Sequence, residues 1–305
     1  MTTKPRNILI FANPISGMGL GGAIAQELSA AAVNAGHRVQ LHLAHPAAAP
    51  DEMLPRGPES VVVVIGGDGT LRSVADRLLR DGPAPDALPS IAMVPLGTAN
   101  LVSKHLGCRR DNQQEAQQLL YAIDRGPRRQ LDVPIANGRA FLAVAGVGFD
   151  AQVVHDLAAN RRGPITYADY LFPALRSIAG YRFPAMSVTV DGKVEIADTP
   201  AIVFVGNIPE YGAGFSVTPN AIGDNGLLDV CVLPCQSWRE LFELGCMCGS
   251  ELQAHDDRAI YRRGKRIEVS STRPVPVQLD GDPAGFTPLV IDLLPHRLTF
   301  IVPAS

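Results

Sequence analysis

The sequence has no long apolar run. No stretch of its 305 residues approaches the roughly 20 apolar residues that a membrane-spanning helix needs. The amino-terminal residues Met1 to Arg6 lead directly into the apolar segment Asn7 to Ala12, which is too short for the core of a signal peptide. We therefore expect a cytoplasmic protein.

Cysteine is scarce, and basic residues are not in excess. The five cysteines form no Cys-x-x-Cys pair and lack histidines at zinc spacing, which favours reduced structural thiols over a metal site. The formal net charge is −3, so we do not expect a nucleic-acid partner. Basic clusters remain at Arg128-Arg129, at Arg161-Arg162 and at residues 262–266.

Two familiar nucleotide motifs are also missing. The sequence contains no Gly-x-x-x-x-Gly-Lys-Ser/Thr loop, and the glycines after the first predicted strand do not have the Rossmann spacing. A P-loop and a dinucleotide site are therefore not predicted.

The most informative stretch that is present runs from Val61 to Thr70. Its five consecutive β-branched residues predict a buried parallel strand. Gly66 and Gly67 at the carboxyl end of the strand let a ligand approach the backbone, and the helical pattern that follows supplies free N–H groups. The stretch therefore predicts a phosphate site, with an ordinary strand-to-helix turn as the alternative.

Two other strands end in the same way. Asn7 to Ala12 precedes a loop that begins with Asn13, and Ile91 to Pro95 precedes the loop of residues 96–100. Parallel strands align their carboxyl ends, so we expect these three loops to converge on one crevice.

The pattern changes near residue 130, from alternating strands and helices to short strands separated by turns. We predict an α/β domain at residues 1–130 and a β-sandwich at residues 131–288, with helices inserted at Pro164 to Ile178 and Ser237 to Leu252. Asn137-Gly138 and Asp191-Gly192 are hairpin signals. Residues 289–305 are candidates for strands that complete the first domain.

Five motifs, in their order and spacing, resemble those of the diacylglycerol kinase catalytic family, which includes bacterial lipid kinases and the sphingosine and ceramide kinases. They are Asn13-Pro14-x-Ser16-Gly17, Gly66-Gly67-Asp68-Gly69-Thr70, residues 95–100, residues 146–151 and Asp280-Gly281-Asp282. The second motif alone is shared with NAD kinases and phosphofructokinase-like folds. The resemblance covers nearly the whole chain.

The resemblance implies a phosphofructokinase-like, ATP-binding α/β domain, a lipid-binding β-sandwich domain and an active site in the cleft between them. The reaction that it implies is Mg²⁺-assisted transfer of a phosphoryl group from ATP to a hydroxyl of a membrane lipid such as diacylglycerol. The nucleotide site that it implies comprises Asn13, Pro14, Ser16, Gly17, Gly66, Gly67, Asp68, Gly69, Thr70, Gly97, Thr98 and Asn100.

Three carboxylates are the predicted catalytic residues. Asp68 is expected to face ATP or its Mg²⁺, with capping of the following helix as the alternative. Asp280 and Asp282 would share a face in an extended segment, which Pro283 favours. Such a pair tends to separate its two pKa values, which favours one general base. Which of the two is the base stays open, and a simple Asp-Gly turn is the alternative.

The sequence departs from the family at several positions. Asp282 stands where the family usually has Glu, and Arg72-Ser73 where Asn-Glu is frequent. At Asp224-Asn225 the family can bind a structural Mg²⁺, but Asn225 lowers the ligand charge and favours a solvated turn. Two alternatives therefore stay open, an NAD-kinase-like enzyme and a nucleotide- or lipid-binding regulator without turnover.

A lipid substrate requires contact with the membrane. We expect peripheral association with its inner face through a local basic surface, with Arg161, Arg162 and the helix around Tyr167 to Arg176 as candidates. The identity of the lipid cannot be read from the sequence, and a homodimer stays open.

Overall fold

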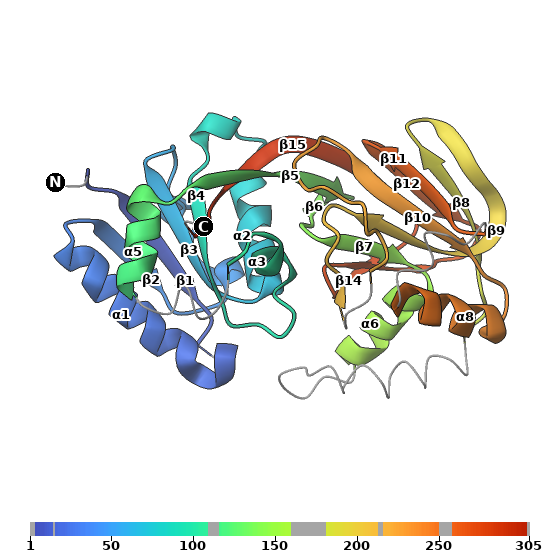
Figure 1. The fold of residues 1–305 in the computed structure, drawn as a ribbon, viewed down its shortest axis with the longest axis horizontal. Coiled ribbons are helices and arrows are strands. Elements are labelled where there is room, and N and C mark those ends of the chain that lie inside the picture. Colours follow the sequence, from blue (N-terminus) through green and yellow to red (C-terminus); the bar gives the residue numbers. More distant parts are fainter. Residues whose placement is uncertain are drawn as a thin grey trace. The chain divides into compact units, whose positions relative to one another are not determined.

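The computed structural model describes residues 4–14, 16–108, 116–159, 181–212, 216–249 and 258–303, without the side chains of residues 16, 18 and 245–249. The chain forms two compact units (Figure 1). Unit 1 comprises Met1–Leu131 and His296–Ser305, and unit 2 comprises Asp132–Pro295. The predicted helix at Pro164 to Ile178, and with it Arg161, Arg162 and the surface around Tyr167 to Arg176, lies outside the described residues.

The sheet of unit 1 is parallel, as the sequence predicts, with the strand order β2-β1-β3-β4-β15. Its strands are β1 (Asn7–Ala12), β2 (Arg38–His42), β3 (Ser60–Gly66), β4 (Ser90–Pro95) and the final part of β15 (Leu289–Ile301). All residues of β3 and β4 are buried, since helices cover both faces of the sheet.

Helices α1 (Leu20–Asn34) and α5 (Ala116–Arg125) pack on one face of this sheet, and α2 (Asp68–Leu79) packs on the other (Figure 1). The first face has a core in which Ile8 and Ile10 meet Leu28 and Ile123. The short helix α3 (Leu101–His105) follows β4. In the described connections, 3-10 helices lie at Ser16–Gly19, Pro46–Ala48, Asp51–Met53 and Pro85–Ala87.

Unit 2 is built from antiparallel strands. They are β6 (Arg139–Ala140), β7 (Val144–Val147), β8 (Ala185–Val190), β9 (Lys193–Gly206), β10 (Leu228–Pro234), β11 (Ile260–Gly264), β12 (Arg266–Ser271), β13 (Pro276–Leu279) and β14 (Asp282–Phe286), and β5 (Arg128–Ala136) enters from unit 1. The long strand β9 pairs with β8 along its first half and with β7 and β10 along its second half. One core contains Met186, Val203, Val230 and Ile267 from these strands, which confirms the predicted sandwich.

Both predicted hairpin turns are present. Asn137 and Gly138 have φ values of 46° and 81°, and Asp191 and Gly192 have φ values of 47° and 80°. Positive φ at two central residues is the geometry that Asn-Gly and Asp-Gly favour in two-residue hairpins. The prediction rests on local backbone preference, and no tertiary contact overrides it.

Other parts of unit 2 differ from the sequence prediction. Residues 139–147 form two short strands, β6 and β7, which are separated by residues 141–143. The sequence does not predict helix α6 (Phe149–Ala159), because the glycines just before it are typical of a turn. Helix α8 (Trp238–Gly249) agrees with the prediction over the described residues. None of the described helices is long and apolar enough to cross a membrane.

The cysteines whose side chains are described are buried and form no disulfide bond with one another. They are Cys108, Cys231 and Cys235, and burial raises the pKa of the Cys235 thiol to about 11. A thiol with a raised pKa is a poor nucleophile and a poor metal ligand, in keeping with a structural role.

Candidate functional site

The three glycine-containing loops of unit 1 contact one another. A Cβ atom added to Gly97 would lie 2.6 Å from the Cα atom of Gly67, and one added to Gly21 would lie 2.6 Å from the carbonyl oxygen of Asn13. A Cβ atom at Gly17 would lie 3.3 Å from the side chain of Leu96. The loops after β1, β3 and β4 therefore meet at the carboxyl edge of the parallel sheet, and they meet through glycine backbone that no larger residue could replace without a shift.

Asn100 fixes the loop after β4. Its side-chain oxygen accepts from the N–H of Gly97 at 2.9 Å, and its side-chain nitrogen donates to the carbonyl of Gly97 at 2.7 Å. Its φ of 48° is a left-handed value that asparagine tolerates. Thr98 is exposed at the tip of this loop. Asn100 thus shapes the loop, and Thr98 is the side chain that the loop presents.

Asp68 is the first residue of α2, but it does not cap that helix. Its Oδ1 accepts from the N–H of Val102 at 3.3 Å, at the beginning of α3. Burial raises the pKa of Asp68, and the N–H groups of Leu101, Val102 and Asn100 oppose that rise. The carboxylate therefore connects the loop after β3 to the loop after β4.

The remaining predicted residues of the nucleotide site differ in accessibility. Thr70 is only 6% exposed, and a Cβ atom added to Gly66 would lie 2.6 Å from its Oγ1, so the hydroxyl packs against the end of β3. Pro14 is exposed, Asn13, Gly17 and Gly69 are half-buried, and the side chain of Ser16 lies outside the described part of the chain. Arg72 is buried in α2 and pairs with Asp76 at 3.5 Å.

The predicted extended conformation is present at Asp282 but is wrong for Asp280 and Gly281. Asp280 and Gly281 have φ values of 50° and 82° and form a two-residue hairpin turn between β13 and β14. Asp282 is the first residue of β14, opposite Leu279. Pro283 favours an extended conformation at Asp282, which lies in β14, whereas the Asp-Gly preference sets the turn at Asp280 and Gly281.

The carboxylate of Asp280 is an anchor for the backbone. Its Oδ2 accepts from the N–H of Leu142 at 2.8 Å, and its Oδ1 accepts from the N–H groups of Ala143 at 2.8 Å and Val144 at 3.1 Å. The N–H of Asp280 in turn donates to the carbonyl of Val144 at 2.9 Å. These contacts fix the hairpin to the segment that leads into β7, and Asp282 lies half-buried just beyond the turn.

A buried network that the sequence did not single out supports the same hairpin. The Oε1 of Gln278 accepts from the N–H of Gly281 at 2.8 Å, and its Nε2 donates to Asp150 at 2.9 Å. The hydroxyl of Tyr211 donates to the other oxygen of Asp150. Burial raises the pKa of Asp150, and both hydrogen bonds oppose the rise. Asp150 lies in one of the five family motifs, but neither Gln278 nor Tyr211 carries a local signal.

Protein groups hold the turn at Asp224-Asn225, where the family can bind a structural Mg²⁺. The side-chain oxygen of Asn225 accepts from the N–H of Leu227 at 3.0 Å. The fully buried Asp132 accepts from the N–H of Gly226 at 2.6 Å, and its own N–H donates to Gly223 at 2.7 Å. The described residues, Asp224 included, contain no cluster of three or more His, Cys, Asp or Glu side chains that could hold a metal ion.

Two known domain families together match most of the chain. The diacylglycerol kinase catalytic domain matches residues 7–133, and the YegS C-terminal NAD kinase beta sandwich-like domain matches residues 143–302. The second match alone covers more than half of the chain. The chain belongs to the diacylglycerol kinase family.

Individual relatives agree with the family assignment. A probable lipid kinase YegS-like protein of Stenotrophomonas maltophilia (strain K279a) is 30% identical over 252 residues, which cover 80% of this chain and 79% of the relative. The diacylglycerol kinase of Bacillus subtilis (strain 168) is 24% identical over 233 residues, which cover 75% of this chain and 73% of the relative.

Solved structures share the fold of this family member. The crystal structure of a diacylglycerol kinase from Bacillus anthracis str. Sterne is 22% identical, covers 97% of this chain and 96% of its own, and has a TM-score of 0.68. Another crystal structure from the same organism covers 99% of both chains at 24% identity, with a TM-score of 0.73. At sequence identities of 22% and 24%, the similarity establishes a shared fold only.

Proposed function

We propose that the protein transfers the γ-phosphoryl group of ATP to a hydroxyl of a membrane lipid such as diacylglycerol. The observation that carries the proposal is the contact among the three glycine loops of unit 1 in a chain of the diacylglycerol kinase family. Relatives named lipid kinase and diacylglycerol kinase support a lipid as the acceptor. We expect the enzyme to act as a peripheral protein at the inner face of the membrane.

The glycine loops suit the phosphates of a nucleotide. Gly67 and Gly97 let the loops after β3 and β4 approach each other closely, and the amino terminus of the 12-residue helix α2 adds a favourable dipole. Thr98 adds an exposed hydroxyl at the same edge. Phosphate oxygens supply most ligands of Mg²⁺ in kinases, and Asp68 is the carboxylate that we assign beside them.

On the acceptor side we assign different roles to the two aspartates of the β13–β14 hairpin. Both carboxylate oxygens of Asp280 accept hydrogen bonds from backbone N–H groups, so we assign Asp280 the role of a positioning residue. Asp282 is then the candidate base that accepts the proton of the lipid hydroxyl. A kinase of this type gains most of its rate from positioning and charge stabilisation, so a rigid hairpin is suited to this role.

Incubation of the protein with labelled ATP, Mg²⁺ and a panel of lipid extracts tests this function. We expect label in a chloroform-soluble product and, for Asp68→Ala, a rate lower by at least roughly a hundredfold in a folded protein. Label in NADP from added NAD would instead identify an NAD-kinase-like enzyme. Nucleotide or lipid binding without any labelled product would identify a regulator without turnover.

A further inference from the structure

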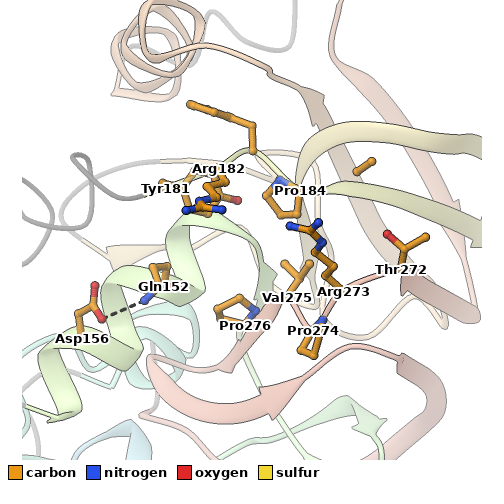
Figure 2. Close-up of a pocket in the computed structure, with 12 residues that line it drawn as sticks. Gln152, Asp156, Tyr181, Arg182, Pro184, Thr272, Arg273, Pro274, Val275 and Pro276 are labelled. Carbon is orange, nitrogen blue, oxygen red and sulfur yellow. Dashed lines mark hydrogen bonds between the residues drawn. The ribbon is translucent and has the colours of Figure 1, made fainter.

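A cavity of about 590 Å³ lies within unit 2. Its walls come from α6, from residues 181–185 before β8 and from residues 272–276 between β12 and β13 (Figure 2). Pro276 and Val275 contribute an apolar wall, whereas Arg182 and Arg273 contribute guanidinium groups. The cavity is therefore apolar on one side and cationic on another.

The two arginines of this cavity are not engaged elsewhere. Arg182 and Arg273 are exposed, and within the described part of the chain no hydrogen bond or ion pair joins either guanidinium to another residue. Other arginines of unit 2 behave differently. Arg262 pairs with Glu195 at 2.6 Å, Arg263 with Asp229 at 3.1 Å and Arg266 with Asp292 at 2.7 Å.

The acidic residue on the cavity wall is already hydrogen-bonded within α6. Asp156 accepts from the Nε2 of Gln152 at 2.9 Å, as Figure 2 shows. Two guanidinium groups against one carboxylate leave this wall with an excess of positive charge, in a protein whose net charge is −3. Planar guanidinium groups match the oxygens of a phosphate, to which they can donate two hydrogen bonds each.

Aromatic side chains adjoin the arginines. The rings of Tyr181 and Phe183 line the cavity, and both contact Trp238 of α8, at centroid distances of 6.2 and 5.0 Å. One helical turn further along α8, Phe242 is 74% exposed. Residues four apart lie on the same face of a helix, so Trp238 and Phe242 form an apolar edge beside the cavity.

We infer that this cavity is a seat for the phosphate-bearing headgroup of an anionic membrane phospholipid, with Phe242 and the neighbouring rings facing the acyl region. Positive charge beside an exposed phenylalanine and a tryptophan fits a lipid surface, where both kinds of group find partners. A free phosphate would use the arginines but would leave the exposed ring in water. This inference rests on the proposed function only in that both place the protein at a membrane.

The seat is distinct from the hairpin that carries the acceptor carboxylates. Pro276 lines the cavity at one end of β13, and Asp280 follows the other end, four residues away. At roughly 3.3 Å per residue these positions are about 13 Å apart along the strand. One headgroup cannot reach both, so the seat holds a neighbouring lipid of the membrane and not the lipid that is phosphorylated.

Vesicle sedimentation without nucleotide tests the inference, because it requires no turnover. The double variant Arg182→Gln/Arg273→Gln is compared with Arg38→Gln/Arg56→Gln, which removes the same charge from two exposed arginines of unit 1. On vesicles of equal parts phosphatidylcholine and phosphatidylglycerol, we expect the first pair to weaken binding by roughly ten- to thirtyfold. The control pair should change it far less, and Arg182→Lys/Arg273→Lys should retain most binding.

Several results would overturn the inference. Equal loss in both glutamine pairs would mean that only net charge matters, and unchanged binding in the first pair would remove the seat. If wild type binds vesicles of phosphatidylcholine alone as tightly as it binds the anionic vesicles, an anionic headgroup is excluded as the ligand.

Two further arms identify the source of the phosphate and separate the inference from the proposed function. Phe242→Ser should weaken vesicle binding. If inorganic phosphate displaces the protein from vesicles, and if its binding depends on Arg182, the cavity is a site for a soluble anion instead. Phosphorylation of a short-chain lipid in detergent should be the same in Arg182→Gln/Arg273→Gln as in wild type. Absence of that activity in wild type would contradict the proposed function and leave the vesicle result to stand by itself.

Discussion

The side-chain amide of Gln278 donates a 2.9 Å hydrogen bond to the buried carboxylate of Asp150, a residue 128 positions earlier in the chain. The same side chain accepts from the N–H of Gly281, in the turn between Asp280 and Asp282. The first turn of α6 and the β13–β14 hairpin are thus held in one geometry by a single glutamine.

Replacing Gln278 by Met should disturb this geometry, since Met has a similar length but neither donor nor acceptor of comparable strength. Asp150 and the N–H of Gly281 would each lose a partner, and unsatisfied buried groups cost about 1–3 kcal/mol. We expect a lower midpoint of thermal unfolding and a fall in turnover, with ATP affinity nearly unchanged because the glycine loops belong to unit 1. A variant with reduced stability but normal turnover would show that Gln278 has no influence on the acceptor side.

The two hairpin aspartates should respond differently to the same substitution. In Asp280→Asn one oxygen becomes an NH₂ group that faces backbone donors, so we expect a loss of about 1–3 kcal/mol in the free energy of unfolding. Asp282→Asn should leave stability almost unchanged and should reduce turnover strongly. Denaturant unfolding and a turnover assay on both variants separate the roles, and a stable Asp280→Asn protein would contradict the anchor that we describe.

Adjacent glycines of α1 provide a matched test of the nucleotide loops. Gly21→Ala would place its Cβ 2.6 Å from the carbonyl oxygen of Asn13, whereas Gly22→Ala would meet nothing within 4 Å. We expect the first substitution to displace the loop after β1 and to weaken ATP binding. The second should leave ATP binding unchanged and should stabilise α1 by about 0.5–1 kcal/mol. Equal ATP affinities by calorimetry would mean that this loop does not contact the nucleotide.

The stability of the protein should depend on pH through Asp150. Burial raises the pKa of this carboxyl in the folded state above its ordinary value of 3.8, so the folded state binds more protons than the unfolded state at intermediate pH. Its contribution to stability is therefore fully present below 3.8 and is lost as the pH rises through the raised pKa.

Asp150→Asn should remove this dependence. The new amide can accept from Gln278 and donate to Tyr211, whose hydroxyl works in either direction. We expect its midpoint of thermal unfolding to equal or exceed that of wild type at neutral pH, and to vary less between acidic and neutral pH. A variant that follows the wild-type curve at every pH would exclude Asp150 as the source.

The features that the sequence predicts well are those with local causes. The run of valines at Val61 to Val64 requires a buried strand, and Asn137-Gly138 and Asp191-Gly192 require hairpin turns, so these elements agree with the structure. Asp280-Gly281 carries the same local signal. Pro283 favours an extended conformation at Asp282, so the local signals are mixed along this segment.

The features that the sequence does not predict depend on distant partners. Gln278 and Tyr211 gain their roles from Asp150, which lies in α6, and no pattern near either residue indicates that contact. The sequence also does not show that Arg182 and Arg273 have no ion-pair partner among the described residues, since Arg262 and Arg263 look similar in sequence but pair with Glu195 and Asp229. Such pairings are set by the register and packing of the sandwich.

Strand β15 has a consequence for the order of events during synthesis. Its last residues lie beside β4, with Phe300 opposite Ile91, and Val302 donates to the carbonyl of Pro127. The unit with the glycine loops therefore emerges first from the ribosome but lacks an edge strand until the sandwich has been translated. A chain released early, even one that contains every glycine loop, would expose the edge of β4, so unit 1 is complete only in chains translated past residue 302.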